Sequence, residues 1–123
     1  MPFPGPITAI TLFAEDLPPT KAFYDRVFAI PAHYEDDASC VFIFGGTMIN
    51  LLKIEEAPDL IAPAKPSTPQ GFQFTLTVDD VDDMCAELQG RGVELLNGPT
   101  DRPWGIRTAS FQDPTGAIWE IAR

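Results

Sequence analysis

The fold is decided by a stretch that occurs twice, ITLFAEDL at residues 10–17 and FTLTVDDV at residues 74–81. An offset of 64 residues carries the first onto the second with the character of most positions kept. A second pair, GTMINL at 46–51 and GAIWEI at 116–121, matches at an offset of 70. Two matches in the same order at nearly equal offsets indicate an internal repeat of about 60 residues.

Both halves of the chain show the same order of elements: a strand, an acidic pair, a helix and three further strands. In the first half, alternation and turn residues predict strands at 7–14, 32–35, 39–44 and 47–54, with a helix that begins near residue 15 and ends before Pro31. In the second half they predict strands at 72–78, 93–96, 107–112 and 117–122, a helix at 81–91 and a turn at 113–116. One such unit cannot bury its core alone, so two are expected to pair.

Length and proline content predict the domain organisation. The 123 residues fit one domain, 1–123, with repeat modules at about 7–54 and 72–123. Between them, residues 55–71 hold four prolines and are interpreted as a linker or long loop.

The net charge of the chain limits the kinds of partner that we expect it to bind. The formal net charge is −10 at pH 7 with only eight Lys and Arg, and the pI is near 4.2. Phosphate binding needs a basic surface, so we expect no nucleic acid partner, and the same field repels anionic membranes. It favours neutral or cationic ligands, although the alternative is that acidic charge only keeps the protein in solution. No apolar run approaches the ~20 residues of a membrane span, and the first residues do not resemble a signal peptide, so we expect a soluble cytoplasmic protein.

The cysteines, the histidine and the acidic residues at two helix starts are interpreted as structural and not as catalytic or metal-binding residues. Cys40 and Cys85 lack metal-ligand spacing and are expected to be buried, reduced thiols. His33, the only histidine, is expected to be solvated or hydrogen-bonded. The acidic residues at 15–16 and 79–83 stand at two predicted helix starts, where interaction with the helix dipole explains them better than metal binding.

The stretch PWGIR at 103–107, followed by FQDPTG at 111–116 and WE at 119–120, makes the chain resemble a known family. Together with the paired βαβββ units, it is similar to the vicinal oxygen chelate superfamily of glyoxalase I, bleomycin-resistance proteins and extradiol dioxygenases, and closest to the bleomycin-resistance-like branch. The resemblance implies an α+β fold in which two tandem βαβββ modules form an open cup from mixed sheets, with the helices outside. It also implies a homodimer.

In enzymes of this family a divalent metal is bound at four symmetric positions, which correspond here to Ala9, Asn50, Gln73 and Glu120. The repeat offsets relate the same positions in pairs. Alanine cannot bind a metal, two amides are weak ligands, and only Glu120 is a strong anionic one, whereas catalytic sites use about three strong ligands. We therefore expect no tightly bound cofactor, with Gln73 and Glu120 as weak metal candidates only.

The same alternation predicts which side chains line the cup. The candidates for ligand binding are Phe13, Asn50, Gln73, Thr75, Trp104, Arg107 and Glu120. Each has a structural alternative: Trp104 could pack under its loop, Arg107 could hold that loop by a salt bridge, and the amides could be hydrogen-bonded within the sheets. Glu120 is the candidate base if the protein is an acid–base enzyme, and it needs a partner such as Arg107 or a ligand cation. Strand 39–44 presents either Phe42 and Phe44 or Val41 and Ile43 to the cup.

Three functions remain open on this evidence. The favoured one is small-molecule binding without turnover, as in antibiotic resistance by drug sequestration, with an aromatic or cationic ligand. The second is a metal-dependent lyase, isomerase or dioxygenase like glyoxalase I, in which a divalent metal would be the cofactor. The third is an accessory module that pairs with another chain.

Overall fold

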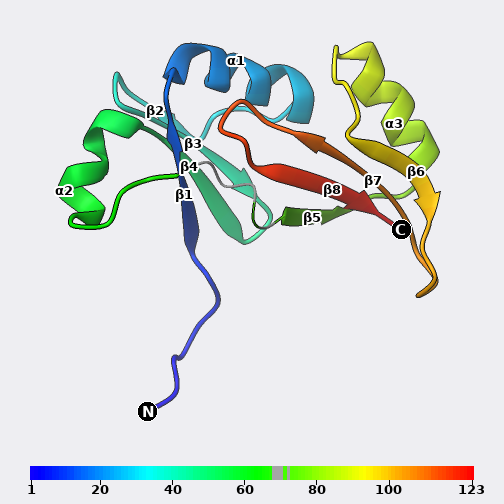
Figure 1. Cartoon of the computed structure of the whole chain (residues 1–123), viewed down its shortest axis with the longest axis horizontal. Coiled ribbons are helices and arrows are strands. Elements are labelled where there is room, and N and C mark those ends of the chain that lie inside the picture. The colour runs from blue at the N-terminus through cyan, green and yellow to red at the C-terminus, as the bar shows by residue number, and fades with distance from the viewer. Residues whose placement is uncertain (68–70, 72) are drawn as a thin grey trace. The chain divides into compact units, whose positions relative to one another are not determined.

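The computed structural model describes residues 1–67, 71 and 73–123 (Figure 1). Contacts divide the chain into two compact units. The first consists of Met1–Asp25 and Ala29–Ser67, and the second of Arg26–Phe28 and Thr68–Arg123. The proposed single domain, 1–123, stays a prediction. Among the described residues, no helix is long and apolar enough to cross a membrane.

The first unit contains a four-stranded mixed sheet in the order β1-β4-β3-β2. Its strands are β1 (Ala9–Ala14), β2 (Tyr34–Glu35), β3 (Ser39–Phe44) and β4 (Thr47–Lys53). β1 pairs with β4 in parallel, and the other neighbours are antiparallel. Helix α1 (Leu17–Phe28) packs on this sheet through Tyr24, whose ring centroid lies 5.4 Å from that of Phe42.

The second unit repeats this topology. Its sheet has the order β5-β8-β7-β6, with β5 (Gln73–Thr77) parallel to β8 (Ile118–Ala122) and antiparallel pairs elsewhere. β6 spans Asn97–Asp101, β7 spans Arg107–Gln112, and α3 spans Val81–Gly90. Two identical strand orders with the same strand directions confirm the α+β fold and the tandem βαβββ modules (Figure 1).

The apolar pattern of each strand decides which face is buried. In β1, Leu12 and Ala14 are buried whereas Ala9 and Thr11 are exposed, as alternation predicts. In α3, the buried residues are Val81, Cys85 and Leu88, which share one helix face. The large side chains that are almost fully buried in the sheets include Phe42, Leu51, Phe111 and Trp119.

The last turn of α1 belongs to the second unit. Phe28 packs against Trp119 and Phe111, with ring centroids 4.7 and 5.8 Å away. Two hydrogen bonds join the same turn of α1 to Arg91. Arg26 Nε donates to the Arg91 carbonyl, and Arg91 Nη1 donates to the Val27 carbonyl. The second hydrophobic core is therefore completed by a segment that precedes it by more than 40 residues.

Two predictions of secondary structure are wrong. The strand expected at 93–96 is a connection, and β6 lies four residues later, because pairing with β7 begins at Asn97 opposite Ser110. The linker 55–71 is not entirely loop. It contains helix α2 (Ala57–Ile61), preceded by the single turn η1 (Ile54–Glu56), and residues 68–70 lie outside the described part. Pro58 is compatible with α2 because it stands in the first turn, where its missing N–H costs nothing.

Candidate functional site

The strongest candidates stand at equivalent places in the two sheets. In the first unit Thr11 is opposite Asn50, and in the second Thr75 is opposite Glu120. Each pair joins the module's first strand to its fourth, as the repeat offsets require. Both pairs lie on the strand faces opposite to Leu12, Ile49 and Trp119, which are buried.

The second sheet has a polar face around Glu120. Thr75 Oγ1 donates to Glu120 Oε1 over 3.0 Å, which gives the carboxylate a neutral partner. Gln73 is exposed two residues before Thr75 on the same strand face. β7 adds three polar residues to this face, opposite Ala122, Glu120 and Ile118 of β8: Thr108, Ser110 and Gln112.

The first sheet has an apolar face around Asn50. Asn50 Nδ2 donates to Thr11 Oγ1 over 3.4 Å, a long contact. Asn50 Oδ1 is buried and has no hydrogen-bond partner among the described residues. Strand pairing places Val41 opposite Asn50 and Ile43 opposite Met48, so these two residues share this face and Phe42 points to the core. Phe13 is half-buried on the same face of β1.

Arg107 does not pair with Glu120. Its guanidinium contacts Asp82 through Nε and Nη2, both at 3.0 Å, and Asp101 through Nη1 at 2.9 Å. The two carboxylates raise the pKa of Arg107. Of the alternatives for Arg107, the structure shows the salt bridge that holds its loop, through Asp101, and not the pairing with Glu120, because Arg107 occupies the other face of β7, toward α3. These bonds link α3, through Asp82, and β6, through Asp101, to β7. A role of Arg107 in ligand binding stays a prediction.

Trp104 does not pack under its loop. The loop between β6 and β7 is closed by Arg102, whose N–H donates to the Ile106 carbonyl over 2.7 Å, and Gly105 turns with a φ of 97°. The Trp104 side chain is 70% exposed. An exposed indole on a closed loop is available for stacking, so the structural alternative for Trp104 is excluded.

Other reactive residues have the structural roles expected of them. Cys40 and Cys85 are free and buried, and His33 is exposed. Asp80 caps α3 by accepting from the Asp83 N–H over 3.0 Å. Asp16 stands at the N-cap of α1 without a side-chain capping bond.

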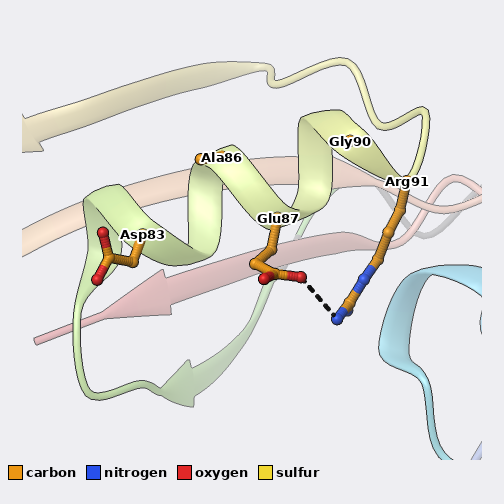
Figure 2. A pocket seen from close by; sticks show the side chains of 5 residues that line it. All are labelled: Asp83, Ala86, Glu87, Gly90 and Arg91. Carbon is orange, nitrogen blue, oxygen red and sulfur yellow. Dashed lines mark hydrogen bonds and ion pairs between the residues drawn. The ribbon is translucent and has the colours of Figure 1, made fainter.

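A hollow of about 620 Å³ lies along α3. Figure 2 shows side chains that line it. Its lining includes Asp83, Glu87 and Arg91, and Glu87 pairs with Arg91 over 3.2 Å. None of the predicted ligand-binding residues belongs to this hollow, so it is a feature of the helix surface.

The donor set does not fit a tightly held divalent metal. Of the four positions, Ala9 has no donor atom, Asn50 and Gln73 are amides, and the Glu120 carboxylate is engaged by Thr75. Within the described ranges, no three His, Cys, Asp or Glu side chains are close enough to hold an ion. The absence of a tightly bound cofactor stays a prediction for metal analysis to test.

Two pairs of residues on these sheet faces were not among the residues predicted from the sequence. Met48 and Leu52 flank Asn50 on β4, and counting by two from Asn50 would have found them. Thr108 and Ser110 lie beside Glu120, and both are buried although they are polar. Counting by two from Gln112 in 107–112 would have placed them on one strand face.

Fold and site define a class of small α+β proteins built from two tandem βαβββ modules, with candidate residues at equivalent positions of each sheet. The chain belongs to the Glyoxalase/Bleomycin resistance protein/Dioxygenase superfamily, whose family model matches residues 7–121.

Three relatives illustrate the range of that family. An uncharacterized protein, YraH, of Bacillus subtilis is 29% identical over 119 residues, which cover 91% of this chain and 93% of that protein. The structure of lactoylglutathione lyase from Agrobacterium tumefaciens aligns with a TM-score of 0.77 and 25% identity over 97% of this chain and 93% of that one. TnmS3, an antibiotic binding protein from Streptomyces sp. CB03234, aligns with a TM-score of 0.73 and 25% identity over 95% and 93%.

Proposed function

We propose that this chain binds a small aromatic or cationic molecule on the sheet faces that carry Asn50 and Glu120, without a tightly bound catalytic metal. The observation that carries this proposal is the donor set. Ala9 and Asn50 stand where strong ligands would be needed, and Glu120 is held by a hydroxyl. The antibiotic binding neighbour, at 25% identity, supports the same function and the bleomycin-resistance-like branch.

Glu120 is the residue proposed to recognise positive charge. Its carboxylate is half-buried and accepts from the neutral Thr75 hydroxyl, a contact that does not neutralise its charge. The exposed indole of Trp104 supplies a stacking surface for an aromatic cation. The net charge of −10 would draw such a ligand to the protein.

A metal-dependent lyase or isomerase is the second candidate. It is favoured by the lactoylglutathione lyase neighbour at 25% identity and by the Glu120 carboxylate, which would be both a metal ligand and the candidate base. Retention of about one ion per chain would select this function.

The proposal also covers the oligomeric state of the protein and its location in the cell. A homodimer and a cytoplasmic location fit a drug-sequestering protein, and antibiotic resistance would be its biological role. Light scattering at several protein concentrations tests the dimer, because a monomer at all concentrations would contradict it.

The binding proposal is tested by titrating the purified chain with ethidium, a planar aromatic cation, and following its fluorescence. Glu120→Gln removes the proposed counter-charge with little change in shape, and we expect about tenfold weaker binding, in line with the loss of one charge contact. Asp83→Asn is the matched control, since it removes one charge from the exposed surface of α3.

Ethidium affinity should be unchanged in Asp83→Asn and reduced in Trp104→Ala. Equal weakening by Glu120→Gln and Asp83→Asn would show attraction by net charge alone and would reject the site.

A further inference from the structure

The first sheet carries an unsatisfied acceptor that its counterpart in the second sheet lacks. In the second unit, the Thr75 hydroxyl donates to Glu120 over 3.0 Å. In the first, the direction is reversed, because Asn50 Nδ2 donates to the Thr11 oxygen over a longer 3.4 Å. Asn50 Oδ1 is left buried without a partner among the described residues. A buried acceptor without a hydrogen-bond partner destabilises the folded state, so its presence needs a physical explanation.

The Thr11–Asn50 pair offers an acceptor and a donor side by side. Asn50 Oδ1 can accept, and the Thr11 hydroxyl, having accepted from Asn50, still has its own hydrogen to donate. Thr11 is exposed, so a ligand can reach its hydroxyl directly. The long contact holds the carboxamide weakly, so a small rotation about its last torsion can turn Oδ1 toward a ligand while Nδ2 stays beside the Thr11 oxygen.

The surroundings of this pair are apolar and uncharged. On the same sheet face, strand pairing places Val41 opposite Asn50, with Met48 and Leu52 two residues away on either side. No carboxylate belongs to this face in β1, β3 or β4, all of which are fully described. A cation would therefore lose its hydration here without gaining a counter-charge, whereas a neutral polar group would gain two hydrogen bonds.

We propose that the Thr11–Asn50 pair binds a neutral amide-type group, an N–H beside a C=O as in a lactam, carried on an apolar or aromatic ring. The N–H donates to Asn50 Oδ1 and the C=O accepts from the Thr11 hydroxyl. Val41 and the flexible Met48 contact the ring. The inference rests on the proposed small-molecule binding function and specifies the chemistry of its first sheet.

The test compares two probes that differ in one donor. Quinolin-2(1H)-one has the N–H beside the C=O, and its N-methyl derivative keeps the ring and the C=O but cannot donate. Both are titrated into ¹⁵N-labelled full chain, with the Asn50 side-chain NH₂ signal as the site-specific reporter. We expect the N–H probe to bind about tenfold more tightly and to shift that signal.

Two variants locate the effect. Asn50→Leu removes the acceptor at similar volume, and the two probes should then bind with equal affinity. Thr11→Val removes the donor and should weaken both probes, since both keep the C=O. Because Asn50→Leu also removes a buried unsatisfied group, its midpoint of thermal unfolding should rise by roughly 2–5 °C. If that variant does not fold, the two probes on the wild-type chain decide.

Equal affinity of the two probes for the wild-type chain would overturn the inference, as would the absence of saturable binding. Shifts confined to Trp104 and the second sheet would overturn it while leaving the proposed function standing. Failure of the proposed function is distinguished by the ethidium titration, which depends on Glu120 and not on Asn50.

Discussion

At the residue scale, Asp113 shows how one buried carboxylate organises a turn. The side chain is 5% exposed. Its Oδ1 accepts from the N–H and hydroxyl of Thr115 and from the N–H of Ala117, at 2.6–3.1 Å, and its Oδ2 accepts from Trp119 Nε1 at 3.2 Å. The sequence predicts the turn at 113–116 from its Asp, Pro and Gly. It does not predict the bond to Trp119, because that depends on β7 and β8 being paired.

Substitution of Asp113 should be costly. Asp113→Ala leaves four donors without their acceptor, two of them buried, and we expect the free energy of unfolding to fall by about 2–4 kcal/mol. Asp113→Asn should be intermediate, since its oxygen can replace Oδ1 while its NH₂ faces the Trp119 donor. Urea unfolding measures both, with the exposed Asp37→Asn as control. A loss below about 0.5 kcal/mol in Asp113→Ala would show that water replaces the carboxylate.

The two thiols should be inert in the native state. Burial raises the pKa of both Cys40 and Cys85, so less thiolate is present at pH 8 than in an exposed cysteine. A thiol reagent such as Ellman's reagent should react with neither in the folded protein and with both in urea. Rapid labelling of the native chain would contradict the buried, reduced state.

At the element scale, the sequence predicts elements wherever apolar periodicity is strong. Alternation marks β1 and β5, and the spacing of Val81, Cys85 and Leu88 marks α3. β6 has no such signal, since its sequence NGPTD is poor in strand-forming residues and its strand structure depends on pairing with β7. The Asp101 partner of Arg107 was missed for the same reason, because Asp101 belongs to β6.

Gly98 in β6 should be irreplaceable. Its φ is 89°, and a Cβ at this position would lie 2.5 Å from the Thr108 carbonyl oxygen and 2.6 Å from Ala109 Cα. Gly98→Ala is therefore expected to destabilise the protein by about 2–3 kcal/mol or more, which urea unfolding measures.

Gly90→Ala is the matched control for Gly98→Ala. Gly90 lies in α3, where a Cβ would meet no described atom outside its own helix within 4 Å, and alanine there favours the helix. Equal stability of the two variants would show that β6 yields to the added methyl group.

At the scale of the whole molecule, the internal repeat is what made the candidate site predictable. One offset relates Thr11 to Thr75 and another relates Asn50 to Glu120, and the structure pairs these residues in the two sheets as the offsets imply. The contrast between an apolar face around Asn50 and a polar face around Glu120 could not be read from the repeat. It depends on the registers of β3 and β7, which the matching stretches do not include.

The metal content of the chain decides whether it binds its ligand without a tightly held metal. The protein is purified without chelator, incubated with excess nickel, zinc, manganese or iron(II), desalted and measured by elemental mass spectrometry. One carboxylate and two amides should retain far less than one ion per chain, and Glu120→Gln should leave that value unchanged. Retention of about one ion per chain, lost in Glu120→Gln, would contradict the claim and establish the metal-dependent function instead.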